Sequence, residues 1–145
     1  MDIPEYVTVE EVQRVCKTLG IRDWTDLQEP SILAEEADCI LAAINVQKMP
    51  IGSANFLMGL EVELEHGLRF SDANVTNNHP LLTGKIVLAH LKETLDYYQR
   101  IDIVEIEADL FKAICAGDLA KAKFKYQKLN KAKLRLHNTE QAQLG

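Results

Sequence analysis

The sequence predicts an all-α protein folded as a single-domain bundle of five or six helices. Seven glycines and four prolines among 145 residues stand mostly at the edges of segments in which apolar residues recur every three or four positions. No segment alternates apolar and polar residues over a useful length, so strands are not expected. A chain of this length can bury a substantial core, and residues 1–145 are therefore expected to form one helical domain.

The first helix is predicted at residues 9–19. Thr8 and Glu11 have the spacing of a capping box at its start, because a threonine side chain can accept a hydrogen bond from the backbone three residues later. Gly20 follows the last apolar residue and is the residue type that commonly ends a helix. An irregular stretch then leads to Pro30.

A second helix comes next, for which Ser31 is placed as the N-terminal cap and residue 46 marks the approximate end. After a break at Pro50, Ser53 opens a third helix that closes near residues 67–70. The inner row of the second helix is expected to contain Leu33, Ala37, Ile40 and Ile44. The main apolar stripe of the third helix is expected to contain Leu57, Leu60, Leu64 and Leu68.

The fourth helix is predicted to begin at Pro80, which suits a first helical turn, with Asn78 or His79 as its cap. The sequence is compatible with two arrangements of residues 80–116. One is a single long helix over this whole range, and the other contains a break near residues 100–102.

The last helix is predicted to run from its cap, Asp118, to about His137, with residues 138–145 as a frayed tail. Residues 118–145 carry 7 Lys/Arg against 2 Asp/Glu, whereas residues 1–117 carry 9 against 20. A basic segment beside an acidic body can bind nucleic acid, but no aromatic platform or nucleic-acid motif accompanies these lysines. We therefore expect a solvated helix flank and no nucleic-acid partner, while the sequence allows a homo-oligomer.

The sequence predicts a cytoplasmic protein without a membrane partner. No run of 18 apolar residues is present, and the first five residues lack the basic start of a signal peptide. Cys16, Cys39 and Cys115 are widely spaced and form no CxxC motif, so buried thiols are expected rather than metal ligands.

Five ionisable side chains fall on helix faces that the apolar pattern turns inward. Glu63 and His66 stand one turn apart on the third helix, His90 and Glu93 do so on the fourth, and Glu36 lies on the second. An unpaired buried carboxylate costs several kcal/mol, so these groups must be paired, protonated or bound to a cation. A divalent metal would satisfy all five, and Glu-x-x-His on inward helix faces holds iron in ferritin-like proteins. These five residues are the predicted metal ligands.

Imidazole and carboxylate ligands suit iron, manganese or zinc better than calcium or magnesium, and iron is the favoured ion. The second pair is reversed and the last helix has no Glu-x-x-His, so a mononuclear site fits the ligand count better than a di-iron centre. Such a site could support redox or oxygen chemistry, but the sequence predicts neither a reaction nor a substrate. The alternative is a non-enzymatic interaction module. Its His–Glu cluster would be a structural hydrogen-bond network, and its basic last helix or an exposed apolar face of the long helix would mediate assembly.

Three motifs in order resemble a widely distributed bacterial domain family of unknown function. They are Glu-His-Gly at 65–67, Asn-Val-Thr at 74–76 and His-Leu-x-Glu-x-x-Asp-Tyr-Tyr at 90–98, and the resemblance covers about residues 53–115. It implies an all-helical fold but no reaction. Thr94-Leu95 replaces an apolar residue and a proline of the family pattern, so a straighter helix is expected here. The likeness to ferritin-like and haemerythrin-like proteins is an analogy. The pattern positions are Glu65, His66, Asn74, Thr76, His90, Glu93 and Tyr97.

Overall fold

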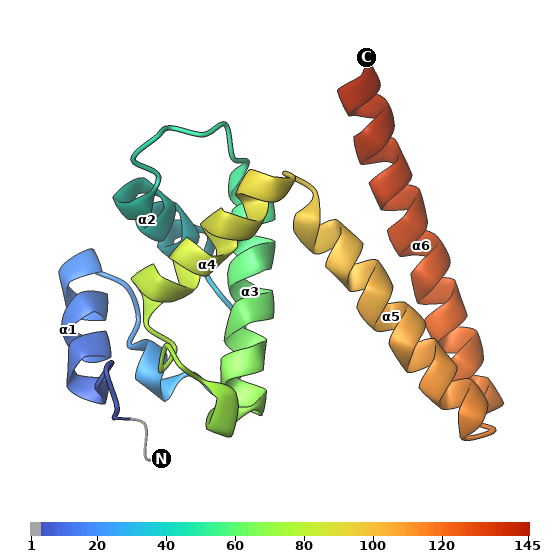
Figure 1. The fold of residues 1–145 in the computed structure, drawn as a ribbon, viewed down its shortest axis with the longest axis horizontal. Helices are drawn as coiled ribbons and strands as arrows, with labels where there is room; N and C mark the ends of the chain where they lie inside the picture. The colour runs from blue at the N-terminus through green and yellow to red at the C-terminus, as the bar shows by residue number, and fades with distance from the viewer. Residues whose placement is uncertain (1–3) are drawn as a thin grey trace. The chain divides into compact units, whose positions relative to one another are not determined.

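The computed structural model describes residues 4–145, and this part of the chain forms six α-helices and no strand (Figure 1). The predicted all-α class is therefore confirmed. The helices are α1 (Val9–Leu19), α2 (Ala34–Ile44), α3 (Ser53–Arg69), α4 (Pro80–Glu93), α5 (Tyr97–Cys115) and α6 (Leu119–Leu144). They divide into two compact units, one ending at Leu95 and the other spanning Asp96–Gly145. None of the helices among the described residues is both long enough and apolar enough to span a bilayer.

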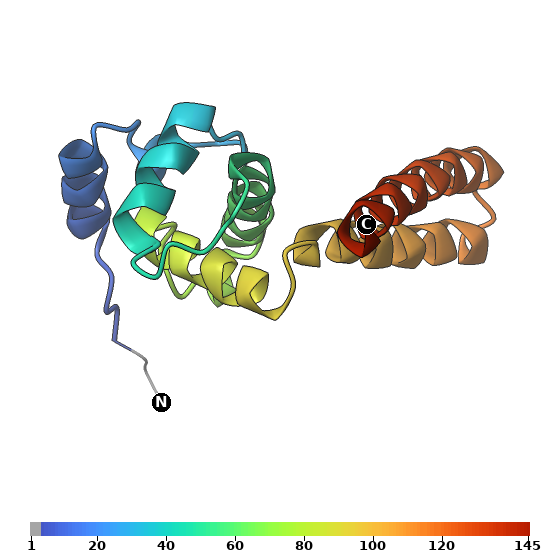
Figure 2. The same ribbon diagram turned by 90° about the horizontal axis from the view of Figure 1, so that it is seen from above.

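The core of the first unit forms where α2, α3 and α4 pack on one another (Figure 2). Gly84 allows α4 to approach α2 closely, because a Cβ atom there would lie only 2.7 Å from Ile40 Cγ2 and 3.0 Å from Ile44 Cδ1. α1 and the short 3-10 turn Trp24–Asp26 close one side of this core. Its completely or almost completely buried side chains are Val12, Trp24, Ile40, Phe56, Leu60, Leu64, Val87 and Leu91.

The Thr8 cap and the Gly20 stop of α1 are confirmed, whereas the Glu11 carboxylate binds Arg14 and does not complete a capping box. The Thr8 hydroxyl accepts a hydrogen bond from the Glu11 backbone N–H at 3.2 Å, and Gly20 ends the helix with a left-handed φ of 69°. The predicted start of the second helix is wrong, because α2 begins at Ala34 and Ser31 does not cap it. Leu33 precedes α2 and is half-exposed rather than inward, and it is the Glu36 side chain that accepts the Leu33 N–H.

The break between α4 and α5 comes earlier than the predicted alternative, and the prediction of one straighter helix is wrong. Thr94 is extended, with φ −158° and ψ 139°. The Asn55 side chain on α3 donates a hydrogen bond to the Leu95 carbonyl at 3.2 Å, which satisfies a group released by the break. Asp96 then restarts the chain as α5, because its carbonyl accepts the Arg100 N–H and its buried carboxylate binds the Arg100 guanidinium.

The second unit is an antiparallel hairpin of α5 and α6 (Figures 1 and 2). Asp118 caps α6 as predicted, since its carboxylate accepts the Lys121 N–H at 2.9 Å. The prediction that the last helix ends near His137 is wrong, because α6 continues to Leu144. Contacts with α5 support the extension, including a hydrogen bond from the Thr139 hydroxyl to the Gln99 side chain. Of the three cysteines, only Cys16 is buried, so the prediction of core thiols is wrong for Cys39 and Cys115.

Candidate functional site

α4 turns inward a different face from the one that the apolar pattern predicts. Its buried residues are Pro80, Thr83, Gly84, Val87 and Leu91. His90 lies beside this face with its side chain 31% exposed, and Glu93 is exposed at the last position of the helix. The prediction that the inward face of this helix carries both residues is therefore wrong. The apolar residues of α4 do recur at helical spacing. The row that packs against α2, however, is the one that contains Gly84, next to the row of His90.

Glu63 on α3 lies between two imidazoles from different helices. His90 Nδ1 on α4 is 3.3 Å from Glu63 Oε1, and His66 Nδ1, one turn along α3, is 3.8 Å from Glu63 Oε2. The Glu63 side chain is only 17% exposed, whereas that of His66 is 49% exposed. The fold thus gathers three of the five predicted ligands around one partly buried carboxylate that remains open to solvent on the His66 side.

A cavity of about 320 Å³ adjoins this cluster, between the C-terminal half of α3, the loop after it and the first half of α4. Glu63 and His66 line one part of it, and Asn74 and Thr76 line another part from the loop. Its apolar lining comes from residues that include Phe70, Val75 and Ile86.

The loop after α3 is held in place by its asparagines. The Asn74 amide donates to the Gly67 carbonyl at 3.2 Å and to the Asn78 side-chain oxygen at 2.9 Å, and the Thr76 hydroxyl donates to Asn74 Oδ1. Gly67 leaves room for this arrangement, because a Cβ atom there would collide with the Asn78 amide. Two of the three family motifs, Glu-His-Gly and Asn-Val-Thr, therefore meet at one wall of the cavity. The sequence contains both motifs but gives no sign that they lie together.

Glu36, the fourth predicted ligand, is engaged elsewhere. Its buried carboxylate receives the Arg22 guanidinium at 2.7 and 3.0 Å and the backbone N–H groups of Arg22 and Leu33, each at 3.0 Å. Burial alone would raise the pKa of this carboxyl, but the Arg22 guanidinium and the two N–H groups outweigh it and leave the pKa below its usual value. Glu36 therefore stabilises the junction between the segment after α1 and the first turn of α2.

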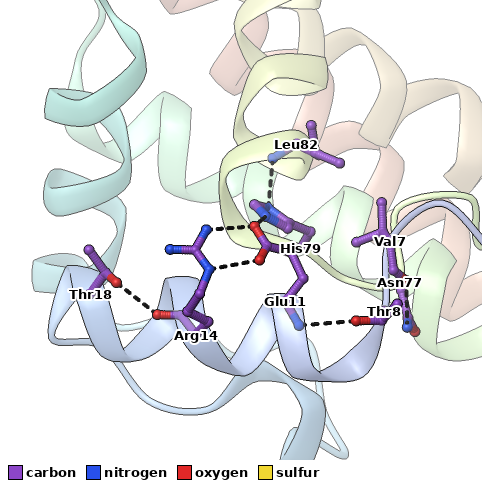
Figure 3. Close-up of polar contacts among 8 residues, drawn as sticks. All are labelled: Val7, Thr8, Glu11, Arg14, Thr18, Asn77, His79 and Leu82. Carbon is purple, nitrogen blue, oxygen red and sulfur yellow. Dashed lines mark hydrogen bonds and ion pairs between the residues drawn. The ribbon is translucent and has the colours of Figure 1, made fainter.

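A second histidine environment, which the sequence indicates only as a possible helix cap, lies at the start of α4 (Figure 3). His79 is 7% exposed, and its Nδ1 accepts the Leu82 N–H at 3.4 Å. Its Nε2 lies 4.0 Å from Glu11, whose carboxylate also binds Arg14 at 2.7 Å. Burial lowers the pKa of His79 below its usual value despite the nearby Glu11 carboxylate. This histidine therefore caps α4 and lies where α4 approaches α1.

Across residues 4–145, no three His, Cys, Asp or Glu side chains already stand as a ready-made metal-binding group. The Glu63 carboxylate faces the imidazoles directly, so an ion could enter only with some movement of these side chains.

The chain matches the model of a known protein family. This family model, described as "Protein of unknown function (DUF5661)", matches residues 12–107, which include all three motifs. No curated protein and no solved structure matches the chain. The match confirms the resemblance to an all-helical family of unknown function and adds nothing to the ferritin-like analogy. The chain, most of which the family model covers, belongs to the DUF5661 family.

Proposed function

We propose that this protein binds one divalent transition-metal ion through Glu63, His66 and His90. The observation that supports the proposal is that imidazoles from two helices face the two oxygens of a single carboxylate, at 3.3 and 3.8 Å. A mixed imidazole and carboxylate set suits iron, manganese or zinc, and we propose iron as the preferred ion. The cytoplasmic location expected from the sequence is part of the same proposal.

The donor separations are compatible with one shared ion. Two ligand atoms that each lie about 2.1 Å from a tetrahedral ion are about 3.4 Å from each other. The His90–Glu63 distance of 3.3 Å already has this value, and the His66–Glu63 distance of 3.8 Å needs a change of only a few tenths of an ångström. His66 is half-exposed, so its ring can make this adjustment without disturbing the core.

The proposal is limited to these three residues. Glu36 is held by Arg22, and Glu93 is exposed at the end of α4. Three protein ligands leave at least one coordination position open, which is the arrangement of catalytic rather than structural metal sites. The adjoining cavity, which Glu63 and His66 line together with Asn74 and Thr76, offers room for water or a small polar molecule at that position.

The experiment is equilibrium dialysis of the untagged protein against Fe²⁺ under anaerobic conditions and, separately, against Mn²⁺ and Zn²⁺, followed by elemental analysis. We expect about one ion per chain, bound at least about tenfold more weakly after Glu63→Gln or His90→Gln. His137→Gln, at an exposed position on α6, and Glu36→Gln are the matched controls and should bind like the wild type. Less than about a tenth of an equivalent of every ion, or equal binding by all four variants, would reject the proposal.

A further inference from the structure

α5 carries two apolar stripes, and only one of them packs within the hairpin. The inner stripe of α5 meets α6 in a small core composed of Ile103, Ile106, Leu129 and Ala132, with Leu110 and Leu136 packed against it. The outer stripe lies on another face of α5, at alternating steps of four and three residues, which is the spacing of a coiled-coil seam. Its members are Tyr97, Ile101, Val104, Ala108, Phe111 and Cys115.

The outer stripe is open over most of its length. Val104 is 58% exposed and Phe111 is 68% exposed, and Ala108 and Cys115 are also exposed. Single exposed apolar residues are ordinary on protein surfaces, but four in succession at heptad spacing on one helix are not. A stripe of this kind has the pattern of a helix–helix interface.

α6 extends this surface with three more exposed apolar residues, Leu119, Tyr126 and Leu134. The register of the hairpin is fixed by ion pairs from Lys125 to Asp109 at 2.6 Å and from Lys133 to Glu107 at 2.9 Å. Tyr126 therefore lies near the level of Phe111, and Leu134 near the level of Val104. Exposed apolar side chains therefore lie at matching levels along both helices of the hairpin.

We propose that two copies of this chain associate through this surface to form a four-helix bundle, in which α5 of each copy lies beside α6 of the other. The charges of the helices favour this order over one with α6 beside α6, and Asp102, Glu107 and Asp109 of α5 already pair with α6 within one copy. α5 carries four acidic residues against two basic ones, whereas α6 carries seven basic residues against one acidic residue. Two hairpins related by a twofold axis place the acidic helix of one beside the basic helix of the other.

The small size of the hairpin core also favours association of two copies. The second unit has 50 residues, from Asp96 to Gly145, and the buried cluster that joins its helices has four members. Units of this size with few buried apolar residues usually need oligomerisation, disulfides or metals for stability. The proposal is independent of the metal site, because Glu63, His66 and His90 all belong to the other unit.

The first test is sedimentation equilibrium of the full chain over a hundredfold range of concentration. We expect a concentration-dependent dimer for the wild type and a monomer for Phe111→Glu. Phe124→Glu is the matched control, because Phe124 is also exposed but lies about 200° around α6 from Tyr126, away from the apolar surface. It should dimerise like the wild type. A monomeric wild type, or equal dimerisation of the two variants with unchanged helical content, would overturn the proposal.

The second test uses two native thiols as probes. Cys115 lies on the outer stripe, whereas Cys39 is exposed on α2 in the other unit. The rate of alkylation of Cys115 should fall at least about tenfold as the protein concentration rises through the dimerisation range, and that of Cys39 should not change. Protection of Cys115 that does not depend on concentration would show that the same chain covers the stripe, and would overturn the proposal. So would a Cys115 rate that stays as fast as the Cys39 rate at every concentration.

Discussion

Arg22 and Glu36 form a two-point ion pair, with Arg22 Nη2 2.7 Å from Glu36 Oε2 and Arg22 Nε 3.0 Å from Glu36 Oε1. The pair ties the segment after α1 to the first turn of α2. Because the Glu36 side chain is only 3% exposed, the carboxylate depends on these contacts for its solvation.

Glu36→Gln should lower the free energy of unfolding by about 1–3 kcal/mol at pH 7, since hydrogen bonds to a charged group are lost. The pKa of Glu36 is depressed in the folded state, so its contribution is present above the unfolded value of about 4.3 and disappears as the pH falls through the lower folded value. Urea unfolding of both proteins should therefore show a difference that shrinks below about pH 4. Glu35→Gln, at the exposed neighbouring position, is the control and should show little difference at any pH.

His90→Leu should change the stability of the metal-free protein by less than about 1 kcal/mol, because a partly exposed ion pair contributes little. Added metal should raise the melting temperature of the wild type but not that of the variant. Calorimetry with and without metal measures both quantities. A loss of more than about 2 kcal/mol in the metal-free variant would indicate a structural hydrogen-bond network instead.

Gly67→Ala should destabilise the protein by about 1–3 kcal/mol, because the new methyl group would displace the Asn78 amide from its contact with Asn74. In an Asn78→Ala background the main obstacle is absent and the Asn74 side-chain nitrogen, at 3.1 Å, is the nearest remaining atom. The same change should then cost much less or become neutral, helped by the higher helix propensity of alanine. A double-mutant cycle from urea unfolding measures this coupling. Equal effects of Gly67→Ala in the two backgrounds would be inconsistent with the contact.

His79→Asn should make the stability of the protein less dependent on pH between about 7 and 5. Burial lowers the pKa of His79 in the folded state, so the unfolded chain takes up a proton first, near its ordinary pKa of about 6.5. Wild-type stability consequently falls as the pH drops through this window, and asparagine keeps a capping side chain without titrating. Unfolding midpoints at several pH values test this, with His137→Asn as the exposed control that should retain the wild-type slope.

Four helix ends in this protein are set by local sequence. The Thr8 cap, the left-handed Gly20 and the Asp118 cap act through backbone groups within four residues of themselves. Pro80 opens α4 and His79 caps it for the same local reason. These ends can be predicted without knowledge of the fold, because the partner of each side chain is its own neighbouring backbone.

Tertiary packing decides instead which face of each helix is buried and which ionisable groups are in contact. Helical periodicity fixes the angles between residues of one helix but not the rotation of the helix against its neighbours, so His90 lies beside the buried face of α4 rather than within it. Glu63 meets His90 across 27 residues, and Glu36 meets Arg22 across 14, through packing that no local pattern encodes. The break at Thr94 is likewise accompanied by a hydrogen bond from α3, and the local sequence there does not predict it.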